Sequence, residues 1–83
     1  MNTQEQTDNW NPTFSKWRHG GWYITNLRYP NGGMGCVSNN YDDKKWRIVC
    51  DPRKFEDQPT YKTRNAAARA ERALIEKEKA EVA

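Results

Sequence analysis

The stretch WYITNLRYPNGGMGCVSN, residues 22–39, decides the fold that we expect for this chain. Residues 22–29 are rich in the aromatic and β-branched side chains that favour a pleated, half-buried strand. Pro30-Asn31-Gly32-Gly33 follows, and an Asn-Gly pair tolerates the positive φ angles that a tight hairpin turn requires. Residues 34–39 are therefore expected to return as the second strand of an antiparallel hairpin.

A third strand is predicted over residues 45–50, after a turn formed by residues 41–44. Successive side chains of a strand lie on opposite faces. Trp46, Ile48 and Cys50 are thus expected on the core face, and Lys45, Arg47 and Val49 on the exposed face. Residues 60–62 offer one further short edge strand, whereas residues 14–19 are ambiguous because Phe14 and Trp17 also have helical spacing.

From Thr63 onward the pattern is helical. Thr63 is a suitable cap, and the small apolar residues that follow form one stripe at helical spacing, namely Ala66, Ala67, Ala70, Ala73 and Leu74. Small side chains let a helix lie close to a sheet with bulky side chains. These elements predict an α+β fold: a three-stranded, or with residues 60–62 four-stranded, antiparallel β-meander packed against one C-terminal α-helix.

Length and composition bound the organisation. Eighty-three residues allow one domain, expected over residues 14–83 after a disordered polar tail at residues 1–13. Four Trp, four Tyr and two Phe predict an aromatic core. The tail does not resemble a signal peptide, and no apolar run approaches the roughly 18 residues of a membrane span. A cytoplasmic protein with no membrane partner is expected.

Residues with catalytic chemistry are few. The chain has one histidine, His19, and two cysteines, Cys36 and Cys50. We expect no enzyme, no cofactor and no metal site, because neither a nucleophile–base pair nor a set of four zinc ligands is apparent. A three-residue turn at 42–44 makes the two cysteines cross-strand neighbours, either as buried small hydrophobic residues, which we favour, or as a disulfide or redox pair.

Positive charge gathers in the sheet region. The net charge is +3, and residues 14–64 hold ten Lys or Arg against five Asp or Glu, whereas residues 65–83 are balanced. Cations that alternate with aromatic residues suit nucleic acid, because they neutralise phosphates and release counterions. The predicted contacts to duplex DNA are Arg28, Lys44, Lys45, Arg47, Arg53 and Lys54.

Residues 35–75 carry a family resemblance. Gly35-Cys36-Val37-Ser38, Lys45-Trp46-Arg47-Ile48, Asp51-Pro52-Arg53-Lys54 and Tyr61-Lys62-Thr63 before Ala66-Ala67-Ala68 resemble the Apetala-two/ethylene-response-factor DNA-binding domain, as found in phage integrase and homing-endonuclease relatives. The resemblance implies a three-stranded sheet on one helix, with the exposed sheet face in the DNA major groove. It implies that Lys45 and Arg47 read DNA and that Lys44 contacts phosphate. It also implies a DNA contact for Trp46, which the strand alternation instead places in the core.

Two functional hypotheses follow. The leading one is a small accessory DNA-binding protein of a phage or plasmid. The alternative is a non-enzymatic protein-interaction module that inhibits or modulates a host protein complex such as a defence system, with Trp10, Trp17 and Tyr29 as its anchors. A homodimer through an unpaired edge strand remains open in either case.

Overall fold

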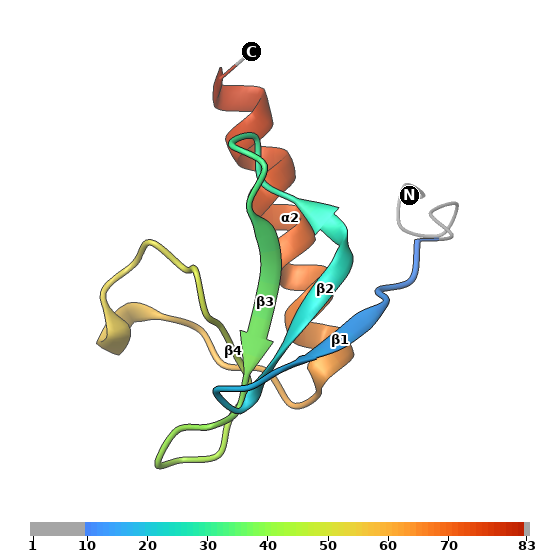
Figure 1. Ribbon diagram of the computed structural model, residues 1–83. Coiled ribbons are helices and arrows are strands. Elements are labelled where there is room, and N and C mark those ends of the chain that lie inside the picture. Colours follow the sequence, from blue (N-terminus) through green and yellow to red (C-terminus); the bar gives the residue numbers. More distant parts are fainter. Residues whose placement is uncertain (1–9, 83) are drawn as a thin grey trace.

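The computed structural model describes residues 10–82, and Figure 1 shows one antiparallel sheet with a helix behind it. The strands are β1 (Phe14–Trp17), β2 (Gly21–Arg28), β3 (Met34–Ser38) and β4 (Arg47–Ile48), in the spatial order β1-β2-β3-β4. A short 3₁₀ helix, η1 (Phe55–Asp57), precedes the long helix α2 (Arg64–Val82). The predicted α+β fold, a meander on one C-terminal helix, is confirmed.

The fourth strand lies on the opposite edge from the predicted one. Phe14–Trp17, which was ambiguous from its spacing, forms β1 and pairs with β2, with Phe14 opposite Ile24 and Trp17 opposite Gly21. Residues 60–62 contribute only an isolated bridge between Trp46 and Tyr61.

The N-terminal boundary of the domain is also earlier than predicted. Residues 1–9 of the expected tail lie outside the described residues, but Trp10 to Thr13 belong to the folded domain. Thr13 accepts a backbone hydrogen bond from Thr25 (2.8 Å), and Arg69 of α2 donates to the carbonyl oxygen of Trp10 (3.0 Å). The assignment of residues 10–13 to a tail is therefore wrong.

The register of β3 with β4 differs from the prediction by one residue. Val37 lies opposite Ile48, and Ser38 lies opposite Arg47, so the two strands are joined by residues 39–46 rather than by a three-residue turn. Val49, not Cys50, bonds to Cys36, through its N–H and the Cys36 carbonyl (2.9 Å). The expected position of Cys36 directly opposite Cys50 is wrong, and so is the expected burial of Cys50: both cysteines are free, Cys36 buried and Cys50 exposed. Cys50 leaves the core face because the chain turns after β4, where the N–H of Asp51 bonds to the carbonyl of Ile48.

The core is aliphatic rather than aromatic. Its fully buried members are Ile24, Leu27, Val37, Ile48, Ala67, Ala68 and Ile75. Aromatic side chains pack around its edge and are half-buried; Trp46 is one of them, as the strand alternation predicted. A large ring rarely becomes fully buried in a domain of this size, because the core is too thin to enclose it.

Helix α2 begins as predicted but presents a different stripe. Thr63 caps it, with its Oγ1 accepting from the N–H of Ala66 (3.0 Å). The buried positions are Ala67, Ala68, Glu71 and Ile75, whereas Ala66 and Ala73 of the predicted stripe are exposed. The predicted stripe contained only apolar residues and therefore did not include Glu71, which is fully buried. No helix among the described residues is long and apolar enough to cross a membrane.

Candidate nucleic-acid interface

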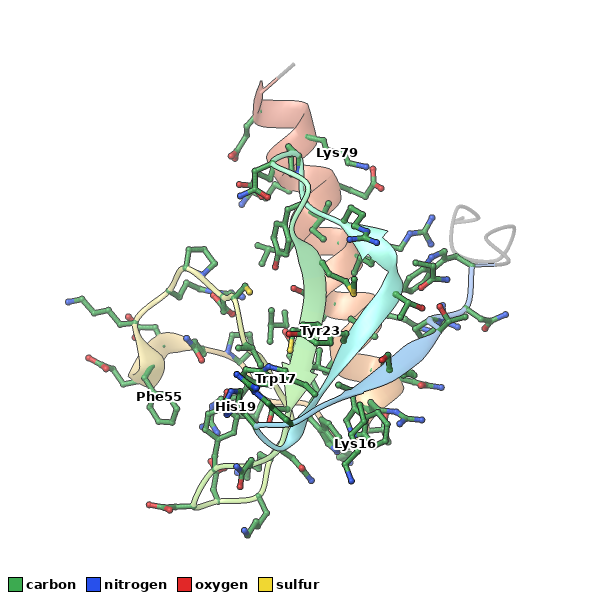
Figure 2. The ribbon with its side chains drawn as sticks, in the orientation of Figure 1. Lys16, Trp17, His19, Tyr23, Phe55 and Lys79 are labelled. Carbon is green, nitrogen blue, oxygen red and sulfur yellow. The ribbon has the colours of Figure 1, made fainter. Side chains whose placement is uncertain are left out.

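One face of the sheet is not covered by α2, although the Tyr41 and Phe55 rings cover part of it at Arg47. Helix α2 lies on the side of Ile24, Val37 and Ile48. The strand register places the alternate residues on the other side, which we call the open face: Ser15, Trp17, Tyr23, Cys36, Ser38 and Arg47. Figure 2 draws Trp17 and Tyr23 in front of the sheet, away from α2.

Three rings gather on the open face. The Trp17 and Tyr23 ring centroids are 6.1 Å apart, and His19 meets Trp17 edge-on at 4.9 Å. We call Trp17, His19 and Tyr23 the aromatic shelf; His19 is exposed and the other two are half-buried. The shelf depends on Gly21, because a Cβ there would lie only 2.8 Å from Cε3 of Trp17. The indole therefore lies directly against the backbone of β2.

Arg47, predicted as an exposed DNA contact, is buried. Only 7% of it is exposed, and its guanidinium donates to both carboxylate oxygens of Asp43 at 2.9 Å. The Tyr41 and Phe55 rings cover the guanidinium, with centroids 5.0 and 4.4 Å from its central carbon. Hydrogen bonds from Arg47 and from the N–H of Lys45 lower the pKa of Asp43 to about 2. The prediction gave Arg47 the correct face, but the two rings cover that face at this point, so its predicted exposure is wrong.

The other predicted cations fall into two groups. Arg53 is exposed but forms an ion pair with Asp51 (2.7 Å), and this partner lowers the pKa of Asp51. Arg28, Lys44, Lys45 and Lys54 are exposed, and none of them forms a side-chain ion pair with another residue between 10 and 82. Lys44 and Lys45 both lie in the segment joining β3 to β4.

Arg18, which was not among the predicted contacts, lies at the same end of the sheet as Lys44 and Lys45. It occupies the β1–β2 turn, which is attached to the end of β3 by two hydrogen bonds. Ser38 Oγ donates to the Gly20 carbonyl (2.9 Å), and Asn40 Nδ2 donates to the His19 carbonyl (3.3 Å). We call Arg18, Lys44 and Lys45 the cationic end. The signal for Arg18 in the sequence was Trp17-Arg18-His19 immediately before a glycine pair.

Two of the three predicted protein-interaction anchors are used inside the domain. Trp10 is half-buried under Arg72, whose guanidinium carbon lies 4.8 Å from the ring centroid. The hydroxyl of Tyr29 donates to Glu71. Trp17 remains accessible in part, and the sequence reasoning missed Phe55, a large hydrophobic residue that is 55% exposed.

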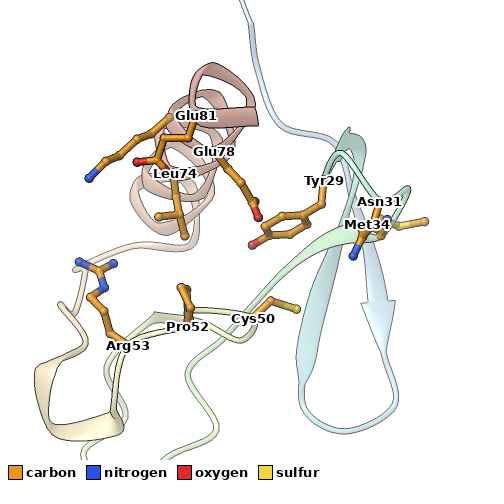
Figure 3. A pocket seen from close by; sticks show the side chains of 11 residues that line it. Tyr29, Asn31, Met34, Cys50, Pro52, Arg53, Leu74, Glu78 and Glu81 are labelled. Carbon is orange, nitrogen blue, oxygen red and sulfur yellow. Dashed lines mark hydrogen bonds between the residues drawn. The ribbon is translucent and has the colours of Figure 1, made fainter. Parts of the chain in front are cut away.

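A groove of about 570 Å³ lies between the β2–β3 hairpin turn, residues 50–53 and the second half of α2. Figure 3 shows Tyr29, Pro52 and Leu74 around it, with Arg53, Glu78 and Glu81 also in its wall. Cys50 opens into this groove, but burial beside Glu71 raises the pKa of its thiol. A thiol with a raised pKa is a poor nucleophile.

The buried carboxyl of Glu71 joins α2 to the sheet. Glu71 is fully buried, and its carboxyl accepts from the Tyr29 hydroxyl and from the N–H of Cys36 (2.9 Å). Within residues 10–82, no group of three or more His, Cys, Asp or Glu side chains is arranged to hold a metal ion. Comparison of the chain with protein-family models, curated proteins and solved structures finds no match. Its function must accordingly be argued from the open face, the aromatic shelf and the cationic end.

Proposed function

We propose that this protein binds DNA along the open face of its sheet, with its phosphates held by the cationic end. The observation that carries the proposal is the position of three exposed cations, Arg18, Lys44 and Lys45, beside partly exposed aromatic rings on a face that α2 leaves uncovered. Lysine and arginine neutralise phosphates, and rings add contact with bases. The sequence resemblance to a DNA-binding domain that uses the same face of its sheet supports the proposal, which includes an accessory role in a mobile element.

Charge balance within the cationic end supports the same conclusion. Asp42 and Asp43 lie in this segment, but Asp43 is neutralised by Arg47, to which it is hydrogen-bonded twice, so two lysines stand against the single carboxylate of Asp42. Lys44 and Lys45 thus present charge to solvent next to a carboxylate whose own charge is already matched. Arg47 itself contributes orientation: it fixes the segment that carries the two lysines.

Contacts of this kind select phosphate more than sequence. Reading base edges in a groove needs long donors such as Arg or Asn that can reach them. Arg47 is committed to Asp43, so the residue expected to read bases instead stabilises the protein. We therefore expect affinity that depends steeply on salt and little on base sequence.

The test is a salt titration of DNA binding by fluorescence anisotropy. The variant Lys44→Asn/Lys45→Gln removes two positive charges, and asparagine tolerates the positive φ of 59° at Lys44. The matched control is Lys77→Gln/Lys79→Gln, which removes the same charge from exposed positions on α2. We expect the first variant to reduce the slope of log affinity against log salt by about 0.7 to 0.9 per lost phosphate contact. The control should leave it unchanged.

Absence of binding to either duplex or single-stranded DNA at about 50 mM salt, by protein that is folded, would overturn the proposal. Equal losses in the two charge variants would also contradict it, because binding would then follow net charge rather than the cationic end.

Exposed Phe55 favours a second function, binding to another protein. An aromatic side chain that is 55% exposed and stacked on an arginine has the character of an interaction anchor. Phe55→Ser should abolish capture of a protein partner while leaving DNA affinity unchanged. The reverse result, loss of DNA affinity with no partner captured by the unaltered protein, would exclude this second function.

A further inference from the structure

The form of DNA that fits the open face can be inferred from its side chains. We propose that the face holds an unpaired strand, whose bases stack on the aromatic shelf of Trp17, His19 and Tyr23 while its phosphates lie along the cationic end. This inference rests on the proposed function and specifies its ligand.

The first argument is the size of the side chains around the rings on the open face. Trp17 lies opposite Gly21, and Tyr23 lies between Ser15 and Cys36 of the neighbouring strands. The side chains around the two rings are therefore small, and the rings are the largest groups on this part of the sheet. A planar base can reach them without first displacing a larger side chain.

The second argument concerns what a duplex would need. The bases of a duplex are stacked on each other, so a protein meets only their edges. Among the residues of the open face, Arg47 alone has a guanidinium, and it is 7% exposed and bonded to Asp43. The other nearby guanidinium, that of Arg18 in the β1–β2 turn, donates to His19 of the shelf itself (3.3 Å). Rings whose neighbouring arginines already have partners suit the flat faces of unpaired bases, and every base has such a face.

The third argument is charge complementarity. The β1–β2 turn joins Trp17 to His19 through Arg18, so a cation lies within the shelf's own segment. Hydrogen bonds from Ser38 and Asn40 hold this turn beside the segment with Lys44 and Lys45. A strand whose bases lie on the rings therefore has three cations next to its phosphates, which identifies a polyanion as the occupant of the face.

The experiment compares three ligands at about 50 mM salt: an oligothymidine of about 15 nucleotides, a duplex of the same length and the matching oligouridine. We expect oligothymidine to bind the unaltered protein on the order of 10-fold more tightly than the duplex. Trp17→Leu should reduce its affinity by a similar factor, because leucine still covers Gly21 but has no π-face. Trp17→Phe should recover most of the loss. Trp10→Leu, the same substitution on the side of α2, should leave the affinity unchanged.

The other possible results separate the stacking inference from the proposed function. Equal affinity for duplex and oligothymidine, or no effect of Trp17→Leu while Lys44→Asn/Lys45→Gln still weakens binding, overturns the stacking inference and leaves the proposed function standing. Loss of all DNA binding by the folded, unaltered protein overturns both. Much tighter binding of oligouridine assigns the face to RNA and overturns the DNA assignment. If Trp17→Leu unfolds the chain, His19→Ala at an exposed position provides the same test.

Discussion

Glu71 is a carboxylic acid without exposed surface, and burial raises its pKa from 4.5 to about 7. The native state therefore binds more protons at this residue than the unfolded state does between those two values. The contribution of Glu71 to stability is therefore fully present below pH 4.5 and is lost as the pH rises toward 7, a loss of about 3 kcal/mol on the scale of 1.36 kcal/mol for each unit of pKa.

Glu71→Gln should abolish this fall in stability. The glutamine oxygen can accept from the N–H of Cys36, and its amide can donate to the Tyr29 oxygen, so both buried partners remain satisfied. In the variant, this position should contribute nearly the same free energy of unfolding at pH 5 as at pH 8, as measured by urea denaturation. At pH 8 the variant should be more stable than the unaltered protein. Glu76→Gln, at an exposed position on the same helix, should keep the original dependence. A Glu71→Gln protein with an unaltered pH profile would show that another group causes it.

Arg47 tests whether a buried cation needs its shape as well as its charge. Lysine keeps the charge but lacks the planar fork that bonds twice to Asp43 and that the adjacent Tyr41 and Phe55 rings cover. Arg47→Lys should lower the thermal midpoint and accelerate amide exchange in residues 51–59, which carry Phe55. Arg28→Lys, at an exposed position without an ion pair among the described residues, should change little. Equal effects of the two substitutions would contradict the role of the aromatic stack.

At the scale of elements, the sequence predicted what local patterns determine. Strands β2 and β3 and the start of α2 follow from an alternating run, an Asn-Gly turn and a threonine cap. The register of β4 and the buried stripe of α2 could not be predicted, because both depend on tertiary partners. Glu71 can lie in the core because Tyr29 and Cys36 donate hydrogen bonds to its carboxyl. Arg47 is buried because Asp43 bonds to it and Phe55 covers it, and both belong to the flanking segments.

The start of α2 should be sensitive to its cap. Arg64 and Asn65 open the helix, and its first turn has no acidic residue to offset the helix dipole. Thr63→Ala removes the bond to the N–H of Ala66 and should cost about 1 kcal/mol. Thr63→Asp should recover that loss or exceed it, because it restores the bond and adds a favourable charge. The measurement is urea denaturation, and an aspartate variant weaker than alanine would contradict the capping argument.

Contact between β3 and α2 requires a glycine at position 35. A Cβ on Gly35 would lie 3.0 Å from Glu71 Oε1 and 3.0 Å from Leu27 Cδ2. Both neighbours are buried, so Gly35→Ala should separate strand and helix and cost about 1–3 kcal/mol. Gly33→Ala, whose only close neighbour is the exposed Asn31 side chain, should cost less. Equal costs would indicate that the two layers yield without strain.

At the scale of the whole molecule, the two faces of the sheet differ in what covers them. One side is closed by α2 over an aliphatic core. The other side bears the aromatic shelf and the covered Arg47, with the cationic end at its margin. Since the shelf lies on the face opposite the aliphatic core, substitutions on the shelf can be expected to alter binding with little effect on the packing of that core.

This separation predicts which amide signals will shift in an NMR titration with oligothymidine. Amide shifts should move in residues 15–23, in the Trp17 indole N–H and in residues 44–45, because these surround the shelf and the cationic end. Amides of residues 74–81 should stay in place, since α2 lies behind the sheet (Figure 1). Trp17→Leu should remove the shifts in residues 15–23 more than those in residues 44–45, because phosphate contacts survive the loss of a stacking ring. Shifts centred on Leu74 and Glu78 would instead place the ligand in the groove beside Tyr29, and the open face would then lose its proposed role.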